Sequence, residues 1–244
     1  MSADTAIESP PLVANRDAMA PSGDFKTPLT EQAYQLIRNR ILKGDMAAGE
    51  KLKIDTLQRD MRISSSPLRE ALNRLVAENL VIADDRRGFR VSPLTIGDLV
   101  DLTSTRIVVE PGALVAAMKH GSDVWEAQIV SAFYRLNRVE DKVSAGEMTR
   151  GEEWTLRHKD FHIALVSGCG SERLTALCGQ LFDQSERYRR LSASLRLKPR
   201  NTANEHKKIM EAALKRDSHA ATLLQQHIER TTEHVVSAFR KSSI

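Results

Sequence analysis

The fold of this chain is decided by residues 63–75, ISSSPLREALNRL, which have the pattern of a short two-faced helix. Leu68, Leu72 and Leu75 recur at helical spacing, so one face is predicted to lie in a hydrophobic core. The serine hydroxyls that precede these leucines in the sequence can cap the first N–H groups of the helix. Pro67 suits the first turn, where its missing N–H costs no hydrogen bond. By itself, the stretch fits an ordinary capped amphipathic helix equally well.

The other face of this helix carries groups suited to DNA. A helix N-terminus with small hydroxyls and an arginine in its first turns favours contacts with phosphates and base edges. The residues of this segment predicted to bind DNA are Ser64, Ser65, Ser66, Arg69, Asn73 and Arg74.

The flanking segments predict a winged helix-turn-helix. One helix is expected over residues 27–43 and a second over about 54–61. Between residues 80 and 91, two short apolar runs enclose a polar, glycine-bearing turn, which is typical of a β-hairpin. Three helices and a hairpin with a basic tip form a domain whose second turn helix enters the major groove. We therefore predict a DNA-binding domain over residues 26–95. The wing residues predicted to contact DNA are Arg86, Arg87 and Gly88.

Charge distribution agrees with a specific DNA-binding domain. Residues 26–95 hold 13 Lys/Arg against 9 Asp/Glu, a net charge of +4. Residues 96–244 hold 22 against 19, which is +3 over twice the length. Residues 1–25 hold 1 against 4 and read as a disordered tail. This modest total argues against a DNA-packaging protein, because non-specific affinity comes mainly from phosphate neutralisation.

The compartment is expected to be the cytoplasm. Two cysteines, Cys169 and Cys178, form no disulfide framework and suit a reducing environment. No apolar run reaches the roughly 20 residues that span a membrane. The N-terminus shows no secretory signal pattern.

The second region, residues 96–244, has helical periodicity without strand-like alternation. A long helix includes residues 99–114, with a candidate kink at Pro111. The further helices are expected over residues 125–143, 154–166, 174–195, 202–214 and 219–239. The predicted fold is therefore mainly α: a winged helix-turn-helix followed by an all-helical bundle of about six helices.

Four histidines are predicted to meet inside this bundle. His158 and His162 are four residues apart and share one helix face, His206 opens the fifth helix, and His227 lies in the sixth. Imidazoles from three helices can form a nitrogen-rich pocket for Zn²⁺ or a similar cation, with open positions for a ligand carboxylate. Taken singly, each is more commonly a solvated or hydrogen-bonded residue. The histidines expected on the surface include His219 and His234.

An anionic effector needs arginine or hydroxyl donors facing the same cavity. Arg106 is the first candidate, and an ion pair with Glu110 along the helix is an equally good interpretation. Extending the apolar face of the fourth helix brings in Ser185, Tyr188 and Arg189, a cluster that suggests a carboxylate pocket. The alternative is a helix end that reaches solvent.

With these motifs in order, residues 28–240 resemble the GntR family of transcriptional regulators, in the branch with an all-helical effector domain, the FCD group. The motifs that carry the resemblance are Ser66-Pro-Leu-Arg-Glu-Ala-Leu72, Arg87-Gly-Phe89, Arg106-x3-Glu110, Asp160-Phe-His162, Glu205-His-x2-Ile209 and Leu223-Leu-x2-His-Ile228. The resemblance implies a homodimer that binds a short palindromic operator and responds to a small metabolite, often a carboxylic acid. It also implies a divalent metal at the four histidines, Zn²⁺ first, with Ni²⁺ or Mn²⁺ as alternatives.

The run over residues 183–191 is also similar to glutarate- and carbon-starvation-linked regulators of this branch, which implies a short dicarboxylate effector. Three positions depart from the family pattern. Ser65 stands where an arginine commonly contacts bases, so a different operator preference is expected. His158 stands where an aspartate commonly binds the metal. The spacing from Asp217 to His227 is one residue short, which makes His227 the least secure ligand.

The predicted function is a metabolite-responsive repressor, released from its operator by a small carboxylic acid. The alternative is a metal-dependent hydrolase that uses the histidine cluster. Against the hydrolase, the sequence has no His-Glu-x-x-His pattern and no carboxylate obviously placed as a general base. We therefore expect no enzymatic activity.

Overall fold

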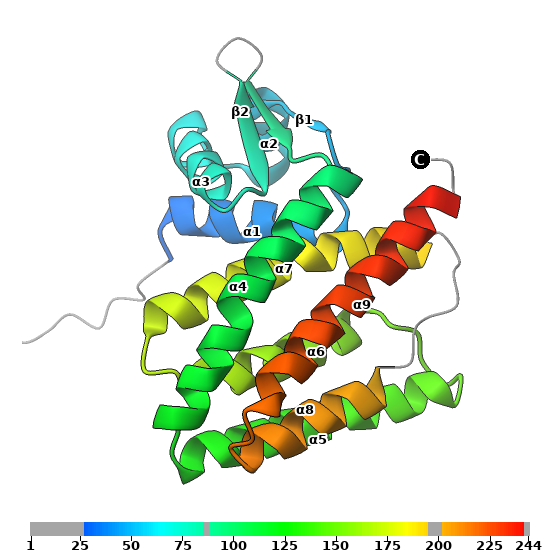
Figure 1. The fold of residues 1–244 in the computed structure, drawn as a ribbon. Coiled ribbons are helices and arrows are strands. Elements are labelled where there is room, and N and C mark those ends of the chain that lie inside the picture. Colours follow the sequence, from blue (N-terminus) through cyan, green and yellow to red (C-terminus); the bar gives the residue numbers. More distant parts are fainter. Residues whose placement is uncertain (1–26, 85–87, 195–201, 242–244) are drawn as a thin grey trace, which may run out of the picture.

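The computed structural model describes residues 27–84, 88–194 and 202–241. It has a small head of three helices and a sheet, seated on a larger bundle of helices (Figure 1). The predicted fold, mainly helical with a winged helix-turn-helix and about six further helices, is confirmed. The predicted tail over residues 1–25 lies outside the described residues.

The head forms around residues 63–75. Its helices are α1 (Leu29–Lys43), α2 (Ile54–Met61) and α3 (Ser65–Ala77). Its strands are β1 (Lys51–Leu52), β2 (Val81–Asp84) and β3 (Gly88–Val91), paired antiparallel in the order β1-β3-β2. The leucine face of α3 is fully buried against Ile37 of α1 and Val91 of β3. Strand β1 was not predicted, because two residues are too few for a periodic pattern.

The turn between α2 and α3 leaves the start of α3 open. Arg62 ends α2 with a left-handed φ of 56°. Ser64 then takes the N-cap position with an extended backbone, but its side chain makes no capping hydrogen bond. Ser64 therefore occupies the predicted N-cap position, but its side chain does not cap the helix, and its hydroxyl stays exposed.

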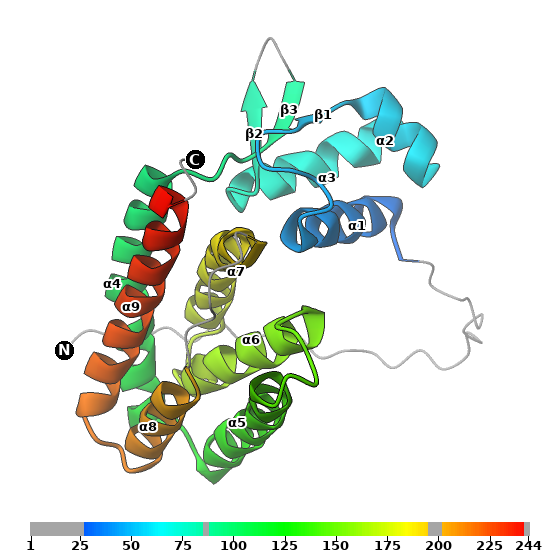
Figure 2. The same cartoon turned by 90° about the vertical axis from the view of Figure 1, so that its right-hand side faces the viewer.

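The bundle contains α4 (Ile96–His120), α5 (Asp123–Ser144), α6 (Glu152–Ser167), α7 (Glu172–Ser194), α8 (Ala203–Leu214) and α9 (His219–Lys241). The last five agree with the predicted ranges to within two residues. Helix α4 packs along α9, and α5 along α6 and α8 (Figures 1 and 2). Their common core is built around large buried side chains such as Trp154, Phe161 and Leu136.

Helix α7 connects the bundle to the head, because it packs against α1 and runs beneath it in Figure 1. The buried carboxylate of Asp183 accepts hydrogen bonds from Arg38 of α1 at 2.5 Å and from Lys159 of α6 at 2.6 Å. Arg38 also donates to Glu78 at the end of α3, at 2.9 Å. The Gln184 side chain donates to the backbone carbonyl of Glu78 at 3.0 Å. The head is therefore held against the bundle by charged groups that share the buried carboxylate of Asp183.

We expect Asp183→Ala to destabilise the protein by on the order of 3 kcal/mol, because it leaves Arg38 partly buried with one carboxylate fewer. Urea unfolding measures the change. Lys43→Ala is the matched control, since Lys43 also links head and bundle, through a 2.7 Å ion pair with Glu152. Both partners of that pair are exposed, so its loss should cost below about 1 kcal/mol. Equal, small effects of the two substitutions would contradict the role given to Asp183.

Candidate metal centre

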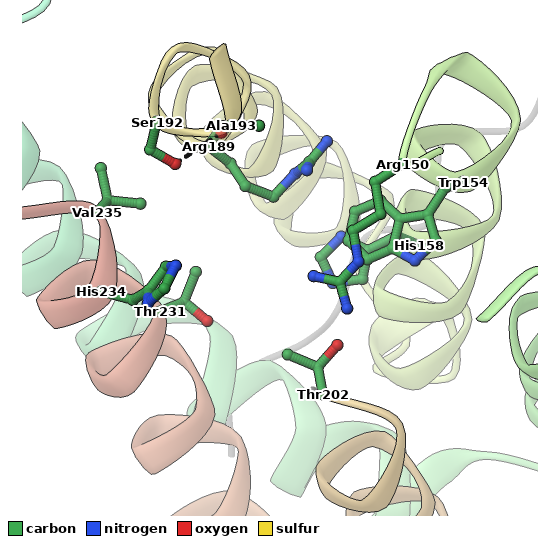
Figure 3. Close-up of a pocket in the computed structure, with 10 residues that line it drawn as sticks. All are labelled: Arg150, Trp154, His158, Arg189, Ser192, Ala193, Thr202, Thr231, His234 and Val235. Atoms are coloured by element: carbon green, nitrogen blue, oxygen red, sulfur yellow. Dashed lines mark hydrogen bonds between the residues drawn. The ribbon is translucent and has the colours of Figure 1, made fainter. Parts of the chain in front are cut away.

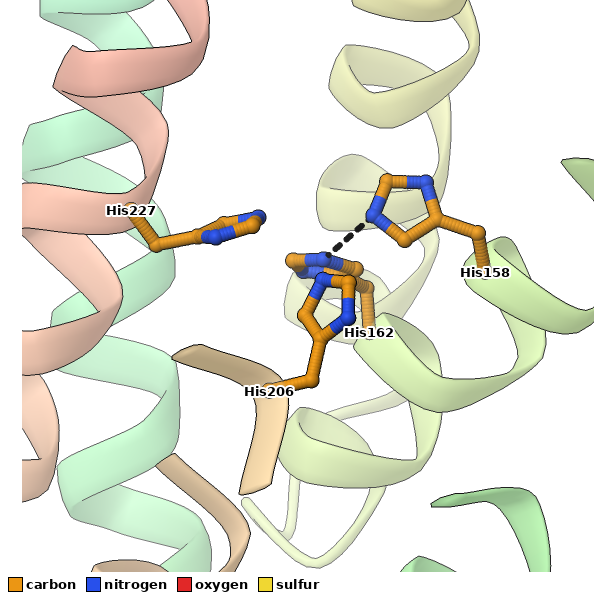
Figure 4. A group of neighbouring side chains, drawn as sticks. All are labelled: His158, His162, His206 and His227. Carbon is orange, nitrogen blue, oxygen red and sulfur yellow. Dashed lines mark hydrogen bonds between the residues drawn. The ribbon is translucent and has the colours of Figure 1, made fainter. Parts of the chain in front are cut away.

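The structure brings all four predicted histidines together between α6, α8 and α9 (Figure 4). One potential ligand atom from each lies within 4.8 Å of those of the other three. The Nε2 atoms of His158 and His162 are 3.1 Å apart. None of the four residues is more than 7% exposed. The one-residue difference in the spacing before His227 therefore does not keep this residue out of the cluster.

A carboxylate lies near the Nδ1 atom of each imidazole on α8 and α9, and the one beside His227 is within hydrogen-bond distance. The Nδ1 of His227 lies 2.9 Å from Glu205, and the Nδ1 of His206 lies 3.4 Å from Glu140. A carboxylate at Nδ1 favours the tautomer with its proton there, which leaves the lone pair on Nε2. Thr202 in turn donates to Glu140 at 3.0 Å. Sequence reasoning did not assign these roles, because they depend on which helices face each other.

Burial keeps the imidazoles on α6 neutral. It is the main cause that lowers the pKa of His158 and His162 well below the usual value, and the neighbouring imidazoles act in the same direction. Neutral imidazole is the form that binds metal ions. Among the described residues, His158 Nδ1 and both ring nitrogens of His206 also have no hydrogen-bond partner. Four converging imidazoles, two of them held neutral and some of their nitrogens without partners, fit a divalent cation.

Two of the predicted effector residues lie beside this cluster. Arg106 is buried and pairs with Glu110 through hydrogen bonds of 2.6 and 3.1 Å. It also donates to Ser185 of α7 at 2.8 Å. The ion pair with Glu110 is therefore present, and the same guanidinium lines a recess with His162 and His227; its contact with an effector stays a prediction.

The other two predicted effector residues, Arg189 and Tyr188, point to different sides of α7. Arg189 lines the recess, 4.4 Å above the Trp154 ring, and donates to Glu186 at 2.6 Å. Tyr188 does not reach it. Its ring packs near Phe239, and its hydroxyl contacts Asp98 of α4. Neighbouring residues of a helix point about 100° apart, so the face of α7 that carries Arg189 cannot also present Tyr188.

A larger cavity adjoins the cluster and contains residues that the sequence did not single out (Figure 3). Arg150 comes from the turn before α6, and Thr202 from the start of α8. His234, expected on the surface, lines this cavity as well. His219 is exposed, as expected. The only signal for Arg150 was its spacing of four residues before Trp154, over whose ring it lies at 4.8 Å.

The predicted DNA-binding side chains mostly lie open on the head. Ser64, Ser66, Arg69 and Asn73 are exposed, whereas Ser65 is half-buried. Arg74 instead turns toward α1, where it pairs with Glu31 at 2.7 Å and stacks over Tyr34 at 3.9 Å. Gly88 opens β3 with a φ of +79°, a conformation that suits glycine at a wing. Arg86 and Arg87 lie outside the described residues.

Comparison with known proteins identifies both parts of the chain. Residues 29–91 match the family model of bacterial regulatory proteins of the gntR family, and residues 101–230 match the FCD domain. Over 202 residues the chain is 38% identical to an uncharacterized HTH-type transcriptional regulator, BphR, of Paraburkholderia xenovorans, covering 82% of each chain. It is 33% identical to the HTH-type transcriptional repressor GlaR of Escherichia coli, over 80% of this chain and 90% of that one.

Solved structures share the fold at lower identity. A GntR regulator from Rhodococcus sp. RHA1 superposes with a TM-score of 0.67 at 20% identity, covering 85% of this chain and 97% of that one. E. coli McbR/YncC gives 0.68 at 16% identity, covering 90% and 100%. In the described part of the chain, no helix combines the length and apolar character needed to cross a membrane.

We expect the metal-free protein, prepared with a chelator, to lose stability as the pH falls below about 6.5. Because their pKa values are lowered, His158 and His162 stay neutral in the folded state, whereas in the unfolded chain they take up protons near the ordinary histidine pKa of about 6.5. Since the unfolded state then binds more protons, the free energy of unfolding falls, by up to about 1.4 kcal/mol per pH unit for each histidine. Urea unfolding at a series of pH values tests this. The variant His158→Gln/His162→Gln should show a shallower slope, and equal slopes would contradict the explanation.

The helix-turn-helix head, the helical bundle and the relatives that cover four fifths of the chain agree. They place the protein among transcriptional regulators and exclude the hydrolase interpretation. The chain belongs to the GntR family of bacterial DNA-binding transcriptional regulators and carries the FCD domain as its C-terminal half.

Proposed function

We propose that the protein is a cytoplasmic, dimeric repressor that a small carboxylic acid releases from a palindromic operator. The observation that carries this proposal is the buried four-histidine cluster, with Arg106 and Ser185 lining the same recess. A divalent metal there would supply a Lewis-acidic position for a carboxylate oxygen, and a buried guanidinium beside it favours an anion.

Zn²⁺ is the metal that we propose first, because imidazole nitrogen suits it and the four histidines can bind it without a charged ligand. Ni²⁺ and Mn²⁺ are the alternatives. The protein residues that would hold the metal are His158, His162, His206 and His227. Glu205, 2.9 Å from His227 Nδ1, would keep that imidazole in the tautomer that binds.

Helix α7 is the proposed route from effector to DNA. Ser185 and Arg189 face the recess, whereas Asp183 and Gln184 hold the head. A ligand that favours one position of α7 would therefore also favour one position of the head.

A homodimer is supported by an exposed apolar row on α4. Val100, Val108 and Val115 lie on one side of this helix and are each about half exposed or more. Such a row is typical of a surface that another chain covers. Two heads related by twofold symmetry would read the two halves of a palindrome. A repressor, in place of an activator, is proposed from the relative that is described as a repressor.

We expect His162→Ala and His206→Ala to remove the bound metal and to lower the melting temperature, because each deletes a nitrogen ligand and leaves a hole in the bundle. Metal content of the purified protein is measured by mass spectrometry of the elements, and melting by calorimetry. His219→Ala, which removes an exposed histidine, is the control and should change neither. Unchanged metal content in the first two variants would show that the metal binds elsewhere in the protein.

We expect Arg69→Ala to weaken binding to a duplex selected by the wild-type protein from a random library by about tenfold or more, since a bidentate base contact contributes about 1–3 kcal/mol. The fold should survive, because Arg69 is exposed. Arg135→Ala removes an equal charge from α5, at the far end of the bundle from the head (Figure 1). Fluorescence anisotropy compares the two, and equal affinities would refute the role of Arg69.

A further inference from the structure

A separate cavity of about 320 Å³ lies where the head meets the bundle, and none of the four clustered histidines lines it. Ile41 and Met46 reach this junction cavity from the head. Leu94 reaches it from the segment that joins the two parts, and Leu191 from α7. Pockets that hold small organic molecules start at about 300 Å³. The aliphatic walls therefore suit a compact apolar body of that size.

The charged groups that line the junction cavity are cations. Lys43, Arg187 and Arg190 contribute to the lining, and none of its described residues carries a carboxylate. Two of the three cations have acidic partners outside the cavity. Lys43 pairs with Glu152 at 2.7 Å, and Arg190 pairs with Glu186 at 3.3 Å. The charge of the third is the one left to be balanced.

Arg187 is that third cation, and it is 7% exposed. Among the described residues its side chain makes one hydrogen bond, to the backbone carbonyl of Ser92 at 2.6 Å, and no ion pair. Burial is the main cause that lowers the pKa of Arg187, and the attraction of Asp98 opposes it only at longer range. A buried charge without an ionic partner is costly, so an anion in the adjoining cavity would compensate it.

The position of Arg187 on α7 separates the junction cavity from the metal centre. Arg189 lines the recess beside the histidines, whereas Arg187 lines the cavity below the head. Residues two positions apart on a helix point about 200° apart, so the two guanidiniums serve opposite faces. Arg187 also borders a cavity on another side, but Asp98 and Asp101 line that one and disfavour an anion there.

We propose that the junction cavity binds a small organic monoanion with a compact apolar body, whose acidic group is held by Arg187. The inference goes beyond the proposed effector function, because the site needs neither the metal nor the histidines. The aliphatic walls would hold the apolar body, and the planar guanidinium would supply paired donors to the acidic group. A monoanion is expected because only one cation of the described lining lacks an acidic partner.

The test is titration calorimetry on the full-length protein after treatment with a chelator. The two probes share one shape: 2-naphthalenesulfonate is an apolar monoanion, and 2-naphthalenesulfonamide is neutral. A sulfonate is a weak metal ligand, so its binding does not report on the histidine cluster. We expect the sulfonate to bind about tenfold or more tightly than the sulfonamide, because a hydrogen bond to a charged group contributes about 1.5–3 kcal/mol.

Three variants locate the binding. Arg187→Gln should weaken the sulfonate about tenfold to a hundredfold and leave the sulfonamide nearly unchanged, because the charged donor is lost. Ala48→Trp puts a large side chain at the exposed edge of the cavity and should weaken both probes. Arg173→Gln, the matched control, removes an exposed arginine near the start of α7 and should bind both probes as wild type does. Circular dichroism and melting show that each variant is folded.

Each result decides the proposal. It is overturned if the sulfonate does not bind wild type at millimolar concentration, or if the two probes bind equally. Unchanged sulfonate affinity in Arg187→Gln or in Ala48→Trp would show that the probe binds elsewhere, which overturns it as well. If Arg187→Gln does not fold, Ala48→Trp and the comparison of probes on wild type give the answer. The proposed effector site survives all these outcomes, because its test depends on the metal.

Discussion

Four imidazoles in contact, away from water, set the main physical constraint on this protein. Burial and the neighbouring imidazoles lower the pKa of His158 and His162, so these two remain neutral. Such an arrangement is unfavourable unless something accepts the imidazole lone pairs or the outer nitrogens find partners. Glu205 supplies such a partner to His227 on α9, and Glu140 lies 3.4 Å from the Nδ1 of His206 on α8. The positions of three helices are therefore linked to one small volume, and the bundle around it has to hold them in register.

The second constraint comes from α7, whose two faces serve different parts of the molecule. One face carries Ser185 and Arg189 to the recess beside the histidines. The other carries Asp183, which takes hydrogen bonds from Arg38 of the head and from Lys159, the residue directly after His158. A helix is stiff over this length, so a displacement that improves contacts on one face changes those on the other. The connection between ligand and DNA head needs no long pathway of residues, because one helix touches both.

Much of the architecture could be predicted because it depends on local pattern. The leucine spacing in α3, the glycine-bearing hairpin and the breakers between helices all act within a few residues, and the bounds of the last five helices of the bundle agreed to within two residues. Strand β1 escaped prediction because its two residues have no period and pair with Arg90 and Phe89, almost forty positions away. The serine cap failed for a related reason: Ser64 has the right position, but its side chain makes no bond to the helix.

The sequence by itself determined the family, the two-part fold and the set of four histidines, because motif order and i,i+4 spacing are properties of the chain. Tertiary structure alone decided which side chains share a cavity. It turned Tyr188 toward Asp98, drew Arg74 onto α1, and brought Arg150 and His234 to the edge of the metal centre. The physical reason is that a local pattern fixes the face of a helix on which a residue lies, whereas the packing of distant helices fixes what that face meets.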